Sequence, residues 1–280
     1  MNGIAIINKK QGLTSRDVVN QISKKLNIKK VGHTGTLDPL ATGVLVVCIG
    51  KATKLVDVLT DLDKEYEAGV CLGIETDTLD ITGNVLREEN VIKNEEEITN
   101  TLNSFVGEYD QEVPIYSAVK INGKKLYEYA RENIPVELPK RKVKIHNISL
   151  TSDVIYKNNK VYFSFKVKVS KGTYIRSLIR DIADKLNTIG TMTSLVRTKQ
   201  GHFDIRNSTD IDNLKIININ ECLKNYFTVI TDDKLYKLVT NGVKLKNLYN
   251  ENIVFFKDKN NNPLALYKLE DNILKLWKMF

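Results

Sequence analysis

The most restrictive stretch of this sequence is a loop of small and turn-forming residues at positions 32–43. It contains three glycines, one proline and a single carboxylate, Asp38. Glycine allows positive φ and the close approach of another backbone, and Pro39 biases Asp38 toward an extended backbone. The uninterrupted apolar run at residues 44–49 then predicts a buried strand. The sequence therefore predicts a conformationally demanding loop attached to a rigid element of the core.

The position of Asp38 in this loop leaves two interpretations open. A carboxylate that a rigid loop holds beside small residues can reach a bound substrate and act on it. The same residues also fit an Asp-Pro pair that only starts a turn. Residue types and spacing do not separate the catalytic interpretation from the structural one, so other parts of the chain have to decide.

Net charge and composition limit the class of protein. The chain has 280 residues, a formal net charge of +8 and 42% hydrophobic residues. This hydrophobic content is sufficient for a sizeable core and excludes general disorder. The positive charge favours a polyanionic partner such as a nucleic acid, although a merely lysine-rich composition is the simpler alternative.

The cysteines indicate a reducing compartment, and the lengths of the apolar runs bear on membrane insertion. Cys48, Cys71 and Cys222 are far apart and form neither a CxxC pair nor a zinc-binding pattern. The chain begins with an apolar strand instead of a signal peptide, and no apolar run approaches the roughly 20 residues that span a bilayer. We therefore expect a cytoplasmic protein with no metal site, no cofactor and no membrane contact.

Local patterns predict the elements that surround the loop. Thr14 with Asp17, and Asn94 with Glu97, form capping signals that each predict the start of a helix. Apolar spacing predicts further helices at 52–59, from 175 to 186, and before Asn241. Alternation or apolar runs predict strands at 3–8, 161–169, 253–256, 264–269 and 273–277.

The run Gly32-His33-Thr34-Gly35-Thr36-Leu37-Asp38-Pro39 resembles the central motif of the TruB family of tRNA pseudouridine synthases. Most of the first 205 residues share the resemblance through further matching segments. These are Lys9-x-x-Gly12-x-Thr14-Ser15, Lys64-x-Tyr66, Tyr116-Ser117-Ala118-x-Lys120, Gly172-x-Tyr174-Ile175-Arg176 and Leu195-Val196-Arg197-Thr198. Lys10 and Val113 stand where the family has proline; at Lys10 the change loosens a turn but removes no functional group.

The resemblance implies that Asp38 is the catalytic residue and that Arg176 pairs with it. Without the motif, an arginine in a helix would be interpreted as a solvated surface charge. The pairing has a physical reason, because an adjacent cation opposes the cost of holding a carboxylate in a dry pocket. Arginine can also fix a carboxylate through its planar fork.

The resemblance further assigns side chains to substrate binding. Tyr66 would stack on the target base, and Leu195 would line the base pocket, although both also fit an ordinary core. His33 resembles the family histidine that helps to displace the target nucleotide from the RNA stack. Tyr174 and Lys9 are assigned to substrate binding because they lie in matched motifs.

The implied fold is α/β (α+β), with a mixed, largely antiparallel sheet flanked by helices and loops. We expect a catalytic domain at 1–231, with an RNA-gripping insertion at about 114–145. A small, β-rich carboxy-terminal domain of the PUA type, which binds RNA, is expected at 232–280. Basic residues and tyrosines alternate in the insertion, which suits phosphate contact plus stacking but also fits a solvated hairpin.

The implied function is isomerisation of uridine to pseudouridine at position 55, in the T arm of tRNA. We expect a stand-alone monomer that flips the base and uses no guide RNA. The sequence leaves open whether Asp38 attacks C1′, attacks the uracil ring or takes a proton. Two alternatives are a non-catalytic RNA-binding protein, and a guide-dependent synthase, which the short carboxy terminus disfavours.

Overall fold

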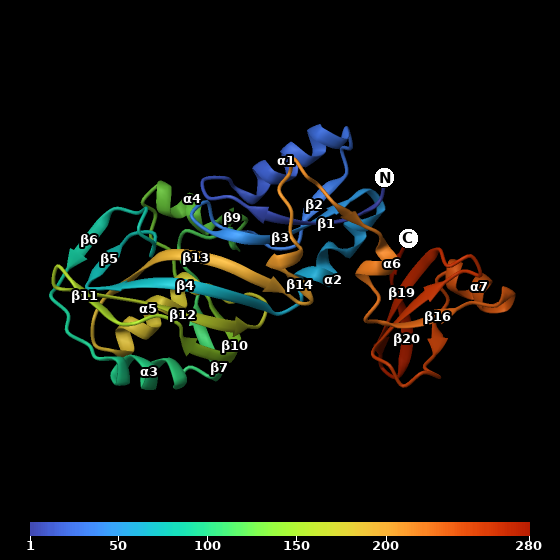
Figure 1. The fold of residues 1–280 in the computed structure, drawn as a ribbon. Coiled ribbons are helices and arrows are strands. Elements are labelled where there is room, and N and C mark those ends of the chain that lie inside the picture. Colours follow the sequence, from blue (N-terminus) through green and yellow to red (C-terminus); the bar gives the residue numbers. More distant parts are fainter.

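A computed structural model of the protein describes residues 1–280 and contains two main sheets that lie side by side (Figure 1). The larger sheet has 11 strands. Its main path is β15 (Ile216–Ile217), β1 (Gly3–Lys9), β3 (Thr42–Ile49), β13 (Gly190–Gln200), β4 (Lys64–Leu72), β12 (Lys160–Val169), β10 (Lys140–Leu150) and β7 (Gly107–Glu112). Three short strands pair outside this path, namely β2 (Val31–His33) with β3, β14 (Phe203–Asp204) with β13, and β11 (Ile155–Lys157) with β12.

The pairing in the large sheet is antiparallel except where β13 meets β3. There the register pairs Val196 with Thr42 and Arg197 with Gly43 in parallel. Gly43 has φ +95°, and a Cβ at this position would lie 2.3 Å from the Arg197 carbonyl oxygen. Only glycine fits this crossing, which lies directly after the loop that carries Asp38. The predicted mixed, largely antiparallel sheet is confirmed.

The helices contact different parts of the two sheets. They are α1 (Ser15–Leu26), α2 (Val56–Thr60), α3 (Glu95–Asn103), α4 (Leu126–Arg131), α5 (Ile175–Lys185), α6 (Ile219–Cys222) and α7 (Asp233–Thr240), with 3₁₀ helices η1 (Gly50–Leu55) and η2 (Ile205–Asn207). Contacts join α1 to β2, α3 to β10 and α5 to β13. The continuous helix expected at 52–59 is wrong in detail, because η1 occupies its first half. None of these helices combines the length and apolar character that crossing a bilayer requires.

Both predicted capping boxes are present. Thr14 and Asp17 exchange side-chain and backbone hydrogen bonds at the start of α1, and Asn94 and Glu97 do so at α3. The apolar faces of α1, α3 and α5 then enter one cluster of 31 buried residues, together with the inner face of the sheet. Local capping and apolar spacing therefore agree on the same helices.

The second sheet has the order β16 (Phe227–Ile230), β18 (Ile253–Lys257), β19 (Pro263–Glu270), β20 (Ile273–Met279) and β17 (Leu245–Lys246). The three strands predicted after residue 250 are therefore present. β16 pairs in parallel with β18, so a domain that starts at residue 232 would omit one of its own strands. We propose that the small domain begins at Phe227. Its fold remains the expected small β-rich domain.

Residues 113–139 connect β7 to β10, which are neighbours in the large sheet. This segment contains the two-stranded hairpin β8 (Lys120–Ile121) and β9 (Lys124–Lys125), followed by α4. The insertion expected at about 114–145 thus overlaps the first residues of β10. A second small hairpin, β5 (Ile74–Thr76) and β6 (Val85–Glu88), follows β4.

The two sheets share a hydrophobic cluster. Phe255 of β18 and Leu266 of β19 are fully buried in a cluster that also contains Ile4, Val44 and Val46 of the large sheet. Removal of a buried aromatic side chain leaves a cavity that its neighbours fill only partly. We therefore expect Phe255→Ala to lower the free energy of unfolding by about 3–5 kcal/mol.

Urea unfolding measures this loss. The matched control is Phe227→Ala in the same sheet, since the Phe227 side chain is 43% exposed and its removal should cost less than about 1 kcal/mol. Equal effects of the two substitutions would show that the shared cluster contributes nothing to stability.

Candidate active site

Asp38 is held in a loop whose two sides contact different elements. Leu37, directly before it, is buried, and Asp38 itself keeps 34% of its side chain exposed. After it, the carbonyl of Pro39 accepts a hydrogen bond of 2.8 Å from the Gly12 amide. The Ala41 amide closes the turn by donating to the Asp38 carbonyl at 3.0 Å. The carboxylate is therefore presented by a backbone that is fixed on either side of it.

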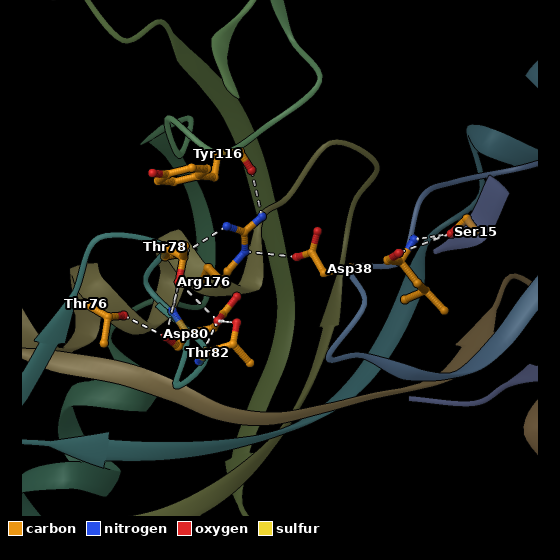
Figure 2. Close-up of polar contacts among 9 residues, drawn as sticks. Ser15, Asp38, Thr76, Thr78, Asp80, Thr82, Tyr116 and Arg176 are labelled. Atoms are coloured by element: carbon orange, nitrogen blue, oxygen red, sulfur yellow. Dashed lines mark hydrogen bonds and ion pairs between the residues drawn. The ribbon is translucent and has the colours of Figure 1, made fainter. Parts of the chain in front are cut away.

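Arg176, at the start of α5, reaches Asp38 from the other side of the site. Its Nε lies 2.9 Å from Asp38 Oδ2. Its Nη1 donates to the Thr78 carbonyl at 2.9 Å, and its Nη2 donates to the Tyr116 carbonyl at 3.0 Å (Figure 2). Each nitrogen of the buried guanidinium thus has one partner, so its plane is fixed, and with it the direction from which it meets the carboxylate.

A turn organised by Asp80 presents the Thr78 carbonyl to this arginine. The buried Asp80 carboxylate accepts hydrogen bonds from the Thr78 hydroxyl, the Thr82 amide and the Thr82 hydroxyl (Figure 2). Leu79, between them, has φ +62°, an unfavourable value for a residue with a branched side chain. Sequence analysis missed Asp80, although the neighbouring Thr76-Asp77-Thr78 run adjoins a matched motif.

The Asp38–Arg176 pair faces a cavity of about 570 Å³. Three of the predicted binding residues line it: Tyr66, Tyr174 and Leu195. Tyr66 and Leu195 are 8% and 7% exposed, so they offer mainly flat or apolar surface at the wall. The cavity thus combines one ion pair with aromatic and aliphatic walls, a composition suited to a planar polar ring.

Two of the residues that line the cavity, Tyr174 and Ser117, bring buried hydroxyl groups close together. Burial raises the pKa of Tyr174, and the Arg141 charge and the Ser117 hydroxyl oppose this rise. Ser117 Oγ is buried, lies close to the phenol, and lacks the geometry of a hydrogen bond with any protein group. The Ser117 hydroxyl therefore keeps unused hydrogen-bonding capacity beside the cavity.

Two buried cations at the cavity wall were not assigned a role from sequence. Arg197 is 1% exposed and donates to the carbonyls of Val44 (2.6 Å) and Gly35 (3.1 Å). Lys64 is 7% exposed, and burial lowers its pKa to about 8, with the Arg197 charge acting in the same direction. Both lie in matched motifs, but a strand pattern does not indicate that a charged side chain is buried.

The structure does not bring Lys9 and His33 to the cavity wall. The Lys9 ammonium is buried and donates to the carbonyls of Leu13 (2.6 Å) and Pro39 (3.4 Å). Burial lowers its pKa to about 8, although the Asp38 charge opposes this. In these contacts the Lys9 ammonium supports the backbone on both sides of the site, and its predicted role in substrate binding stays a prediction.

His33 lies at the end of β2 and is half-buried. Its Nδ1 accepts a hydrogen bond from the Gly35 amide at 3.4 Å. Burial lowers the pKa of His33, and the charges of Arg16 and Arg197 add to this effect, so the neutral ring is favoured. Its role in displacing a nucleotide stays a prediction.

No group of three or more His, Cys, Asp or Glu side chains is arranged to hold a metal ion.

Comparison with known proteins defines the class. Residues 23–175, more than half of the chain, match the family model described as TruB family pseudouridylate synthase (N terminal domain). The fold is thus that of a pseudouridylate synthase. The matched range includes Asp38 and Tyr66 and ends one residue before Arg176.

Full-length relatives extend the match. A protein of Clostridium tetani named tRNA pseudouridine synthase B is 46% identical, covering 99% of this chain and 95% of its own. One of Mesoplasma florum with the same name is 44% identical, covering 98% and 96%. The chain therefore belongs to the TruB family. The crystal structure of a Cbf5-Nop10-Gar1 complex is also similar, with a TM-score of 0.71 at 25% identity over 98% of this chain and 83% of that chain.

The guanidinium of Arg176 suggests a direct test. Arg176→Lys replaces the guanidinium by an ammonium, which cannot reach Asp38 and both carbonyls with one planar group. We expect the rate at saturating RNA to fall by about 10²-fold, while the affinity for RNA changes little.

Single-turnover kinetics and filter binding with the same RNA measure the two quantities. Arg180→Lys is the matched control, because Arg180 lies on the same helix and pairs with Glu112 and Asp181 outside the cavity. Full activity of Arg176→Lys would show that a point charge is sufficient beside Asp38.

Proposed function

We propose that this protein isomerises uridine to pseudouridine in tRNA, at position 55 of the T arm, as a stand-alone enzyme. The observation that carries the proposal is the Asp38–Arg176 pair, with 2.9 Å between Nε and Oδ2, at a cavity lined by Tyr66 and Leu195. Two relatives that match nearly the whole chain bear the name tRNA pseudouridine synthase B, which supports tRNA as the substrate.

The reaction breaks the N1–C1′ bond of uridine and forms a C5–C1′ bond. The proton on C5 is lost and N1 gains one, so substrate and product are isomers, and neither an oxidant nor a group donor is consumed. In our proposal Asp38 is the catalytic residue. It attacks C1′, attacks the uracil ring, or only takes a proton.

Arg176 would act on Asp38 mainly when RNA is bound. In the free protein 34% of the Asp38 side chain is exposed, so water shares in solvating the carboxylate. A base that enters the cavity removes this water, and a carboxylate without a counter-charge would then be costly. The guanidinium is already buried and held by two carbonyls, so it offers that counter-charge without reorganisation.

Base flipping follows from the position of the pair. A base inside a stacked RNA loop cannot enter a cavity of this kind, so the target nucleotide has to leave its stack. Tyr66 would replace part of the lost stacking, and Leu195 would close the pocket on the apolar side. The His33 ring does not line the cavity. In our proposal it helps to displace the target nucleotide from the RNA stack.

Residues 113–139 would grip the RNA arm. Lys124 Nζ lies 5.1 Å from the Tyr129 ring centroid, while Lys125 Nζ and the Arg131 guanidinium each lie 5.2 Å from that of Tyr127. Tyr127 and Arg131 also line the cavity. The cations and rings thus extend from the reacting site outward, as phosphate contact combined with base stacking requires.

The decisive test is Asp38→Asn. Asparagine keeps the size and the turn-forming ability of aspartate but cannot act as a nucleophile or base. We expect isomerisation to fall by at least about 10²-fold, while RNA affinity changes by less than roughly tenfold, because affinity comes from distributed phosphate and stacking contacts.

The measurement pairs single-turnover tritium release from C5-labelled uridine in an unmodified tRNA transcript with filter binding of the same transcript. Pure protein without added RNA also tests the absence of a guide. Near-normal release by folded Asp38→Asn protein would refute the catalytic assignment. Loss of both release and binding would make Asp38 an RNA-positioning residue and favour a non-catalytic RNA-binding protein.

The salt dependence of binding tests the gripping segment. Replacing Lys124 and Lys125 by glutamine should make the slope of log K against log salt shallower by about 1 to 2, because each lost phosphate contact removes roughly 0.7 to 0.9. We expect a change in slope near 1, because Lys124 also pairs with Glu132 and so neutralises phosphate less fully than a free lysine.

The matched control is the double replacement of Lys93 and Lys157, which lie beside α3 and in β11. We expect it to leave the slope unchanged. An unchanged slope in the first variant, with a shallower one in the control, would place the RNA near α3 and β11 instead.

A further inference from the structure

The loop that carries Asp38 is joined to the start of α1 by one side chain. The Leu37 amide donates to Ser15 Oγ at 2.8 Å, and the Ser15 hydroxyl donates to the Leu37 carbonyl at 3.2 Å (Figure 2). One hydroxyl therefore satisfies both backbone groups of the residue that precedes Asp38. Leu37 lies outside every helix and strand, so its amide and carbonyl have no partner from regular secondary structure.

Both partners of this contact are buried. Ser15 is 2% exposed and Leu37 is 3% exposed, so water does not replace the hydroxyl if it is lost. Ser15 is also fixed in place, because it is the first residue of α1. The capping box of Thr14 and Asp17 sets the start of that helix. The contact thus transmits the position of a rigid helix to a loop that has no regular structure.

We propose that Ser15 is a positioning residue that sets the direction of the Asp38 carboxylate toward Arg176. Ser15 does not line the cavity, so it acts through Leu37 and touches no substrate. The proposal rests on the proposed function of Asp38. If Ser15 only filled space in the core, its hydroxyl would have no effect on the reaction rate. Under the proposal the hydroxyl is required for the normal rate.

The geometry of the pair explains why one hydroxyl matters. Arg176 is held by the carbonyls of Thr78 and Tyr116, so the guanidinium cannot follow a displaced carboxylate. The remaining freedom lies in the loop of Asp38, whose side before the carboxylate is tied by Ser15. A displacement of about 1 Å at a reacting group can cost on the order of 10²-fold in rate.

The first experiment compares three variants by single-turnover kinetics on tRNA transcript. We expect Ser15→Ala to lower the rate at saturating RNA by about 10- to 100-fold and to leave the RNA concentration for half-maximal rate within roughly threefold. Ser15→Cys keeps nearly the same volume but has a weak donor and acceptor, so it should resemble alanine.

Ser23→Ala is the matched control. Ser23 lies about two turns further along the same helix, and its hydroxyl donates to the Ile28 carbonyl at 2.7 Å instead of contacting the Asp38 loop. Its removal should leave the rate unchanged. A wild-type rate in both Ser15 variants would overturn the proposal. Should Ser15→Ala fail to fold, Ser15→Cys, which leaves no cavity, decides the question.

A double-mutant cycle separates positioning from general damage. If Ser15 acts by aligning Asp38 with Arg176, Ser15→Ala should cost less in an Arg176→Lys background than in the wild type. Fully additive losses in rate would mean that the hydroxyl acts independently of the pair, and would overturn the proposal.

Hydrogen exchange provides a measurement that needs no activity. The amides of Leu37, Asp38, Leu40 and Ala41 should exchange faster in Ser15→Ala than in the wild type and in Ser23→Ala. Unchanged protection in this stretch would overturn the proposal even for an active enzyme. If the wild type does not isomerise uridine, the proposed function fails, whereas faster exchange would still show that Ser15 holds the loop.

Discussion

The buried guanidinium of Arg176 is the interaction on which the site depends. It joins parts of the chain that are far apart: the Asp38 loop, the turn at Thr78 and the start of the segment at Tyr116. A buried cation is tolerated where it is paired and hydrogen-bonded, and here each guanidinium nitrogen has one acceptor, so these three acceptors must lie close to the guanidinium plane. The Asp38 loop and the segment at residues 113–139 are therefore built to a common reference, which is the start of α5.

Much of the fold could be predicted, because its signals are local. Capping boxes at Thr14 and Asn94, apolar spacing and strand alternation each act within a few residues. What could not be predicted depends on partners distant in sequence. β16 lies before the expected domain boundary but completes the second sheet, and its pairing with β18 has no signature in its four residues.

The site was predictable in a different sense. Motif resemblance identified Asp38 and Arg176, and the structure places them in contact. The resemblance did not distinguish residues that line the cavity from residues that hold the backbone around it. Lys9 lies in a matched motif, yet its ammonium is bonded to loop carbonyls away from the cavity. Arg197 and Asp80 hold the backbone around the pair and received no role, because a sequence pattern does not show which polar groups become buried.

The buried cations also explain why the partner of Asp38 is an arginine. Burial lowers the pKa of Lys9 and of Lys64 to about 8, even though acidic groups near each lysine act in the opposite direction. A lysine at position 176, which is 5% exposed, would meet the same desolvation and would hold its charge less securely. Arginine side chains keep their charge when buried and present several donors in one plane. A guanidinium at position 176 can therefore do two things at once. It supplies the counter-charge for Asp38, and it donates to the carbonyls of Thr78 and Tyr116.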